Sequence, residues 1–218
     1  MKQIAIYGAG GLGKETLILI QQINLLEKRI NPLEQEWEIV GFFDDNIARD
    51  GHIHNIPVLG GMDDLNRWEE KIYIVLAIGD PSIKKNLKKK ISNPLVHFPV
   101  LIHPSVQIFD FQNIKIGAGS VICAGNILTT DIIIGNHVII NLNCTIGHDV
   151  KIGDFSSFMP ACNISGNITF EEGVYIGTGA KLINTITLGR FSTIGAGAVV
   201  LKNVPDGAKW VGVPAKDL

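Results

Sequence analysis

The chain has 218 residues, of which 46% are hydrophobic and 18% charged, so it can bury a substantial core in one large or two modest domains. Its net charge of −2 at pH 7 gives no electrostatic basis for binding nucleic acid. The segment after Met1 lacks the pattern of a signal peptide, and no apolar run of about eighteen residues occurs that could cross a membrane. The three cysteines look like small core residues of a reducing compartment, so we expect a cytoplasmic protein.

A glycine turn follows the first predicted strand, residues 3–7. The turn reads Gly8-Ala-Gly-Gly-Leu-Gly13, and a helical run extends from residue 14 to about residue 28. In a nucleotide-binding unit such glycines let the backbone approach a phosphate, and the helix N-terminus supplies free N–H groups. The spacing alone is a weak signal, and a tight turn without a ligand is the alternative.

Two carboxylates close the second predicted strand, residues 38–43. Asp44 and Asp45 stand where a ribose or a base is often bound, at the carboxyl end of a strand. Taken alone, the pair is as typical of a solvated turn. Its position directly after the strand favours the nucleotide site.

The remaining N-terminal elements continue the alternation of strands and helices. We predict strands at 56–61 and 72–78, the second followed by Gly79, and helices at 63–69 and 82–91. The lysines of the last helix are expected to form a solvated face. His52 and His54 lack a carboxylate or cysteine at ligand spacing, so we assign them to a loop and expect no metal site.

From residue 114 to residue 203 the chain divides into fifteen consecutive hexads. The third place of every hexad holds a large apolar residue, beginning with Ile116, Ile122 and Leu128 and ending with Val200. A helix would repeat near every 3.6 residues and a flat strand every 2, so a period of six indicates short strands separated by tight bends. Three strands make a triangular coil of eighteen residues, which predicts about five regular coils. We place the domain boundary near Pro99, with domains 1–98 and 99–218.

The hexad pattern resembles that of the hexapeptide acyltransferases. This resemblance implies a left-handed parallel β-helix, and the ending Val211-Gly-Val-Pro-Ala-Lys216 is similar to the family's coenzyme A-contacting tail. The N-terminal motifs narrow the resemblance to the sialic-acid O-acetyltransferase-like family, which includes enzymes acting on nucleotide-linked amino sugars. These motifs are Gly8–Gly13, Val40–Asp45, Ile56–Gly61, Ala77–Gly79 and Ile102–Ser105.

Family resemblance also implies the roles of both domains. A small Rossmann-like domain would bind the sugar nucleotide, the β-helix would bind acetyl-CoA, and a homotrimer would place each site between two subunits. Substrate-binding residues are then expected at Gly10, Gly11, Leu12, Gly13, Asp44, Asp45 and Gly79. Coenzyme-binding residues are expected at Ser157, Gly166, Gly177, Ala196 and Lys216.

The predicted catalytic residues are His148, Asp149 and Asn141. The stretch from Asn141 to Asp149 matches the one that holds the family's catalytic histidine, which can accept the proton of an attacking amine. Asp149 would orient the imidazole, although neighbouring residues of a strand point to opposite sides unless the corner twists. The eighteen-residue period puts Thr130 below His148 and Gly166 above it, and we expect the glycine to leave a gap for a pantetheine arm. His137 is expected at the surface.

Two departures from the family pattern are present. Leu12 and Ser157 stand where some relatives have histidines, which leaves the details of the sugar-phosphate and coenzyme contacts open.

We therefore predict an acetyl-CoA-dependent N-acetyltransferase acting on the 4-amino group of a nucleotide-linked amino-dideoxy sugar in surface glycan synthesis. One alternative is an O-acetyltransferase of sialic acid or a related sugar, because the two reactions differ only in pocket residues. Another is a non-catalytic, nucleotide-binding trimeric scaffold whose β-helix serves only for trimerisation.

Overall fold

A computed structural model of the chain describes residues 2–30, 36–47, 49 and 51–218. The chain divides into two compact units. The first comprises Met1–Gly79 and Ile83–Pro99, and the second comprises Asp80–Ser82 and Val100–Leu218. The assignment of the sugar nucleotide to one domain and the coenzyme to the other stays a prediction.

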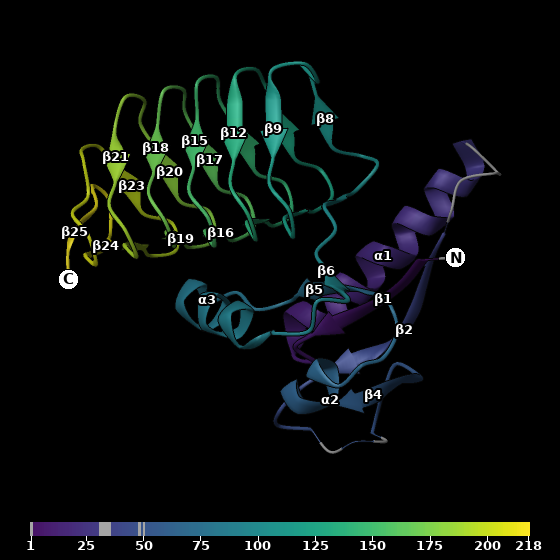
Figure 1. Cartoon of the computed structure of the whole chain (residues 1–218). Helices are drawn as coiled ribbons and strands as arrows, with labels where there is room; N and C mark the ends of the chain where they lie inside the picture. Colours follow the sequence, from purple (N-terminus) through teal and green to yellow (C-terminus); the bar gives the residue numbers. More distant parts are fainter. Residues whose placement is uncertain (1, 31–35, 48, 50) are drawn as a thin grey trace. The chain divides into compact units, whose positions relative to one another are not determined.

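The first unit is built on a six-stranded sheet with the order β3-β4-β2-β1-β5-β6. All neighbouring strands are parallel except β3 and β4, which form a hairpin. The strands are β1 (Lys2–Tyr7), β2 (Trp37–Phe43), β3 (His52–Ile53), β4 (Ile56–Gly60), β5 (Ile72–Leu76) and β6 (Val96–His97) (Figure 1). The helices are α1 (Gly11–Ile30), α2 (Met62–Asn66) and α3 (Pro81–Lys90), of which the first two residues of α3 are grouped with the second unit.

The predicted strands and helices of this region are present, with two short strands in addition. The assignment to a loop was wrong for His52, which lies in β3 and pairs with Pro57. His54 and Asn55 form the two-residue hairpin turn, with φ values of 49° and 64°. The prediction that the lysines of the last helix form a solvated face was wrong for Lys84, because this residue is buried.

The second unit is a parallel β-helix, as the hexads predict (Figure 1). Its three faces are sheets of eight, six and five strands. The first sheet contains β7 (Leu101–Ile102), β10 (Val121–Ile122), β13 (Ile139–Ile140), β16 (Ser157–Phe158), β19 (Tyr175–Ile176), β22 (Thr193–Ile194), β24 (Lys209–Val211) and β25 (Lys216–Asp217). The second contains β8 (Gln107–Ile108), β11 (Ile127–Leu128), β14 (Thr145–Ile146), β17 (Asn163–Ile164), β20 (Lys181–Leu182) and β23 (Val199–Val200). The third contains β9 (Ile114–Ile116), β12 (Ile132–Ile134), β15 (Lys151–Ile152), β18 (Thr169–Phe170) and β21 (Thr187–Leu188).

Strands stack at intervals of eighteen residues. Ile139 pairs with Val121 on one side and with Ser157 on the other, and the same step holds on the other two faces. The predicted eighteen-residue coil is therefore confirmed.

Between faces the chain turns at three corners, and each turn uses a residue in the left-handed region. Every sixth place of a hexad from Gly119 to Gly197 has φ between 54° and 75°. Glycine, asparagine and aspartate, which tolerate this region best, fill most of these places. We name the corners after one residue each. The His148 corner contains residues 130–131, 148–149, 166–167 and 184–185, the Leu142 corner contains 124–125, 142–143, 160–161, 178–179 and 196–197, and the His137 corner contains 118–119, 136–137, 154–155, 172–173 and 190–191.

Polar side chains inside the β-helix bridge successive coils. Buried Ser120 donates from Oγ to the Gly135 carbonyl, and the same oxygen accepts from the Val138 N–H. Buried Asn126 makes the corresponding bridge, because its Nδ2 donates to the Ile140 carbonyl and its Oδ1 accepts from the Cys144 N–H. Cys144 and Cys162 are free thiols one coil apart in this core, and their mutual hydrogen bond, together with burial, raises the pKa of Cys162.

His137 is buried, contrary to the expectation that it lies at the surface. Its ring stacks on Phe155, with centroids 5.3 Å apart and an interplanar angle of 8°. A Cβ on Gly119, one coil before, would fall 2.6 Å from Cε1 of the imidazole. The left-handed residues of this corner thus form a column in which a ring lies over a glycine or over another ring.

The same column gives a stability prediction at Gly173, where a Cβ would fall 2.5 Å from Cδ1 of the Phe191 ring. Gly197 is the matched control, because it has a similar φ but open space around its missing Cβ. We expect Gly197→Ala to lower the free energy of unfolding by about 1–2 kcal/mol through backbone strain alone. Gly173→Ala should cost about 1–3 kcal/mol more, because the ring must move.

Denaturant unfolding at equal protomer concentration measures the difference. Equal losses for the two variants would show that ring packing at this corner contributes nothing.

Candidate functional site

His148 and Asp149 form a hydrogen-bonded pair on the outside of the β-helix. They lie at the corner between β14 and β15, with Nδ1 of the imidazole 2.8 Å from Oδ2 of the carboxylate. Their side chains are 63% and 61% exposed, so both are open to a substrate. The carboxylate reaches the ring because Asp149 has φ = 58°, which twists the corner. The left-handed turn thus permits an interaction between two residues that would diverge on a straight strand.

The pair fixes the proton on the neutral imidazole. An ionised carboxylate can only accept a hydrogen bond, so the ring donates from Nδ1 and keeps a lone pair on Nε2. Nε2 is therefore the atom of this pair that can remove a proton from a bound substrate.

Gly166 lies directly against the imidazole. A Cβ on this glycine would overlap Nε2, and it would fall 2.5 Å from Cε1 and 2.8 Å from Cδ2. The eighteen-residue period correctly placed the glycine over the ring. The expected gap for a pantetheine arm is not there, because the ring itself fills the space. Whether Gly166 also contacts the coenzyme stays a prediction.

The backbone holds the pair from both sides. Asn167 N–H donates to the His148 carbonyl at 2.7 Å, and Asp149 N–H donates to the Thr130 carbonyl at 3.3 Å. These bonds belong to a regular series in which a sixth-place N–H meets a fifth-place carbonyl one coil before. The backbone of the dyad therefore belongs to the regular stack of coils.

The other predicted β-helix residues lie elsewhere on the same chain. Asn141 follows β13, is 5% exposed, and accepts the Leu142 N–H on Oδ1 at 2.7 Å. Gly177 follows β19 two coils later, and its missing Cβ faces the backbone N of Ala196. Ser157 lies in β16 of the same sheet. These four residues thus belong to the eight-stranded sheet and the Leu142 corner, away from the His148 corner.

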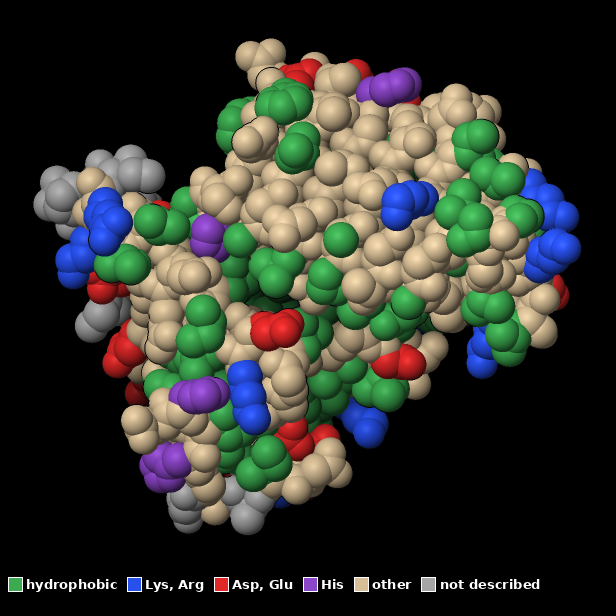
Figure 2. Space-filling view, turned by 180° about the vertical axis from the view of Figure 1, so that it is seen from behind, with side chains coloured by type: hydrophobic (Ala, Val, Ile, Leu, Met, Phe, Trp, Pro, Cys, Tyr) green, Lys and Arg blue, Asp and Glu red, His purple; other side chains and the backbone are tan. Residues whose placement is uncertain are grey.

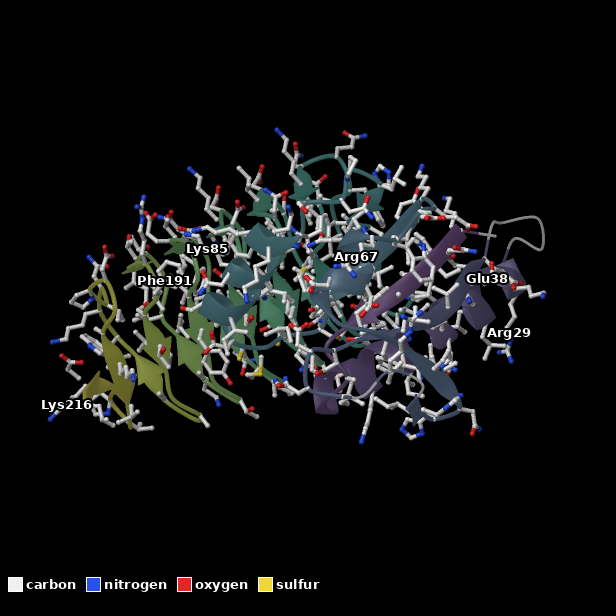
Figure 3. The ribbon with its side chains drawn as sticks, turned by 60° about the horizontal axis from the view of Figure 1, so that its bottom comes forward. Arg29, Glu38, Arg67, Lys85, Phe191 and Lys216 are labelled. Carbon is white, nitrogen blue, oxygen red and sulfur yellow. The ribbon has the colours of Figure 1, made fainter. Side chains whose placement is uncertain are left out.

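Lys216 lies at the C-terminal end of the β-helix and points outward (Figure 3). Strand β25, which carries it, folds back antiparallel onto β24. Figure 2 shows basic and hydrophobic side chains gathered at this end of the β-helix. Val211, in β24, and Val213 are exposed, and the Lys202 ammonium lies 5.3 Å from the Trp210 ring centroid.

In the first unit, the predicted substrate residues meet at the carboxyl edge of the sheet. Gly8 follows β1, Asp44 follows β2 and Gly79 follows β5, and these three strands are adjacent. Gly13 packs against the backbone of Gly8, so a side chain there has no room. Gly10 and Gly11 face open space, and the first turn of α1 contains no acidic residue. The helix N-terminus therefore retains the free donors and the polarity that favour a phosphate.

Leu12 lies in the first turn of α1, and its carbonyl accepts the Thr16 hydroxyl at 2.8 Å. The apolar side chain offers no polar contact to a sugar phosphate. That Leu12 contacts the substrate stays a prediction, and only its backbone N–H could make a polar contact there.

Asp44 and Asp45 already have structural partners. Asp44 accepts the N–H groups of Ala9 and Asn46, at 2.8 and 2.9 Å. Asp45 accepts the Tyr7 hydroxyl at 2.9 Å and the Met62 N–H at 2.8 Å. Burial, followed by the hydrogen bond to Asp45, raises the pKa of Tyr7 and keeps its hydroxyl protonated. The carboxylates tie the glycine turn, β1 and α2 together, and each oxygen retains a second lone pair for a ligand.

A hollow of about 500 Å³ lies beside these carboxylates. Its lining includes Asp44, Asp45, Arg49, Gly61 and Lys90, but not the glycines at the start of α1. Within the described ranges no cluster of three or more histidine, cysteine or acidic residues could hold a metal ion.

Comparison with known proteins agrees with this architecture. Residues 3–91 match the family described as the PglD N-terminal domain. The whole chain is 29% identical to the GDP-perosamine N-acetyltransferase of Escherichia coli O157:H7, over 97% of that protein. Among solved structures, WeeI from Acinetobacter baumannii AYE has a TM-score of 0.85 and 29% identity, with both chains covered completely. The chain is similar over its whole length to the family of PglD-type sugar acetyltransferases.

Two further solved structures of this family contain the coenzyme. The acetyltransferase domain of PglB from Neisseria gonorrhoeae FA1090, in complex with acetyl coenzyme A, has a TM-score of 0.82 and 29% identity over 100% of this chain and 99% of that one. PerB from Caulobacter crescentus, in complex with CoA and GDP-perosamine, has a TM-score of 0.82 and 26% identity over 100% and 98%. In the part of this acetyltransferase that the structure describes, no helix is long and apolar enough to span a membrane.

One residue that the sequence patterns did not indicate is hydrogen-bonded to the His148 corner. Asp110 lies before the first regular coil, and its Oδ2 accepts the Thr130 hydroxyl at 2.7 Å. The spacing Asp110-Phe-Gln-Asn113 is typical of a side-chain-stabilised turn. That signal would have indicated the turn, although not its contact with the corner.

We expect Gly166→Ala to lower kcat for acetyl transfer at least about tenfold, because the new Cβ displaces the imidazole and shields Nε2. Stability should change little, since a half-exposed ring can move aside. Asn184→Ala, one coil further along the same corner, is the matched control and should keep the wild-type rate. Steady-state kinetics and thermal unfolding check both variants, and a wild-type rate for Gly166→Ala would contradict the assigned ring position.

Proposed function

We propose that this acetyltransferase transfers acetyl from acetyl-CoA to the 4-amino group of a nucleotide-linked amino-dideoxy sugar. The observation that carries the proposal is the exposed His148–Asp149 pair, which leaves a lone pair on Nε2 at a corner of the β-helix. The reaction class follows the relatives, of which those from E. coli and C. crescentus are described with perosamine. Variants of the C. crescentus enzyme at a single histidine have also been solved with CoA and GDP-perosamine.

The proposed reaction needs one base and one orienting group. The amine attacks the thioester carbonyl, so that a C–N bond forms and the carbonyl π electrons move to oxygen. Nε2 of His148 takes the proton that the nitrogen loses, and Asp149 stabilises the resulting imidazolium. The C–S bond then breaks, and the same proton passes to the leaving thiolate of CoA. Acetyl-CoA, when bound, supplies the activated acyl group.

The predicted site residues of the β-helix lie at two different corners, and this separation supports an assembly of several copies. His148, Asp149 and Gly166 lie at one corner, whereas Asn141, Gly177 and Ala196 lie at or beside the Leu142 corner. A site that uses both sets needs the second edge from another copy of the chain. We therefore propose a homotrimer in which His148 of one copy faces the Leu142 corner of the next.

The coenzyme is proposed to lie between these two edges. Gly177 and Ala196 offer backbone without large side chains beside a thin pantetheine arm, and Ser157 supplies a hydroxyl on the neighbouring strand. Lys216, with Lys202 and Lys209, would attract the phosphates at the C-terminal end. The substrate's diphosphate is proposed at the start of α1, with Gly10, Gly11, Leu12 and Gly13 supplying backbone contacts. Asp44, Asp45 and Gly79 then lie beside the nucleoside.

N-acetylation is preferred over O-acetylation because the relatives that cover the whole chain include an enzyme described as acting on an amino sugar. A purely structural role of the β-helix would not require the hydrogen-bonded dyad at its surface. A cytoplasmic location fits the three free cysteines.

Replacement of His148 by alanine tests the base. We expect His148→Ala to lower kcat about 10²- to 10⁴-fold with GDP-, UDP- or dTDP-linked 4-amino sugars, because the amine loses its proton acceptor. Binding of CoA should stay within a few-fold of wild type by calorimetry. The matched control is His54→Ala, in the hairpin turn of the first unit. Full activity of His148→Ala would refute the assigned base.

Mixed assemblies test the shared site. His148→Ala and Ala196→Trp should each be inactive, one through loss of the base and the other through obstruction of the coenzyme. When the two variants are refolded or co-expressed together, some interfaces combine an intact His148 edge with an intact Ala196 edge, so activity should return to part of the wild-type level. Simple mixing without subunit exchange is the control. If co-expression restores no activity, each site is contained within one chain.

A further inference from the structure

We infer that Thr130 and Asp110 are positioning residues for the His148–Asp149 dyad, an inference that rests on the proposed function. They act on the backbone bond that sets the place of Asp149.

The hydrogen bond below Asp149 is the longest of its series. At the described corners a sixth-place N–H donates to a fifth-place carbonyl one coil before, usually at 2.7–3.2 Å, and the Asp149–Thr130 bond measures 3.3 Å. The bond above, from Asn167 to His148, measures 2.7 Å. A long bond restrains orientation weakly, so the position of Asp149 depends on whatever else holds Thr130.

Asp110 supplies that restraint. Its Oδ2 accepts the Thr130 hydroxyl and the Asn113 side-chain N–H, both at 2.7 Å. Its Oδ1 accepts the backbone N–H groups of Gln112 and Asn113 at 3.2 and 3.3 Å. The hydrogen bonds from Asn113 and then from Thr130 lower the pKa of Asp110, so it stays ionised and makes charge-assisted bonds.

Thr130 has a second acceptor that competes for its single proton. Asp131 Oδ2 lies 3.0 Å from the Thr130 hydroxyl, compared with 2.7 Å for Asp110. Asp131 occupies the same left-handed place below Asp149, with φ = 55°. The shorter distance assigns the hydroxyl proton to Asp110, and this bond ties the His148 corner to the turn at residues 110–113. Contacts therefore run in order from Asp110 to Thr130, Asp149 and His148.

The experiment compares Thr130→Val with Thr130→Ser in the full-length protein. Valine keeps the shape and removes the hydroxyl, so kcat should fall on the order of three- to tenfold, with KM for acetyl-CoA within about twofold of wild type. Serine should restore most of kcat, because it keeps the donor. Asp110→Ala should match Thr130→Val, and Asp110→Asn should recover part of the loss because it keeps an acceptor oxygen. Thr169→Val, on β18, is the matched control and should leave the kinetics unchanged.

Nitrogen-15 NMR of the His148 ring, assigned by comparison with His148→Ala, gives a readout that needs no turnover. Wild type should show Nδ1 protonated and Nε2 unprotonated, and Thr130→Val should show a mixture of the two tautomers. An unchanged kcat and ring spectrum in Thr130→Val would overturn the inference. So would a loss of kcat that only follows a loss of folded protein in thermal unfolding. If wild type acetylates no sugar, the proposed function fails, and the ring spectrum still decides the positioning role.

Discussion

The eighteen-residue repeat of backbone hydrogen bonds is the constraint on which the β-helix depends. Each coil is too short to bury its apolar residues alone, so it gains stability only by stacking on its neighbours. Stacking in turn requires every corner to turn by the same amount, and a left-handed residue at each sixth place accomplishes this. That regularity brings Asp149 back toward His148, because the turn reverses the direction in which the carboxylate points. The hydrogen bond between His148 and Asp149 thus follows from the left-handed turn that every corner uses.

Much of this architecture could be predicted from the sequence because period and burial are linked. Apolar third places indicated the inward face, and a step of eighteen correctly placed Gly166 over His148. The left-handed sixth places were missed, since Phe155 and Phe191 stand there beside the glycines and asparagines that normally signal such a conformation. The burial of His137 was also missed, because it depends on the Phe155 ring and on Gly119, which lie one coil away on either side. Side-chain direction at a corner follows from φ, which the hexad pattern does not report.

The first unit shows a different limit of the sequence pattern. The position of Asp44 and Asp45 after β2 correctly put them at the carboxyl edge of the sheet. The pattern could not show that their oxygens hold Ala9, Met62 and Tyr7. Those partners come from neighbouring strands and from α2, so they depend on the sheet order. A carboxylate that organises the glycine turn and also faces a ligand would couple the shape of the turn to what is bound there.

The hairpin formed by β24 and β25 has a consequence for how such a molecule meets its neighbours. An exposed terminal coil offers unpaired N–H and C=O groups, which invite another chain to add itself end to end. On the eight-stranded face the antiparallel β25 covers that edge, and Trp210 closes the interior behind it. On this face, the hairpin therefore hinders another chain from adding a strand along the axis of the β-helix.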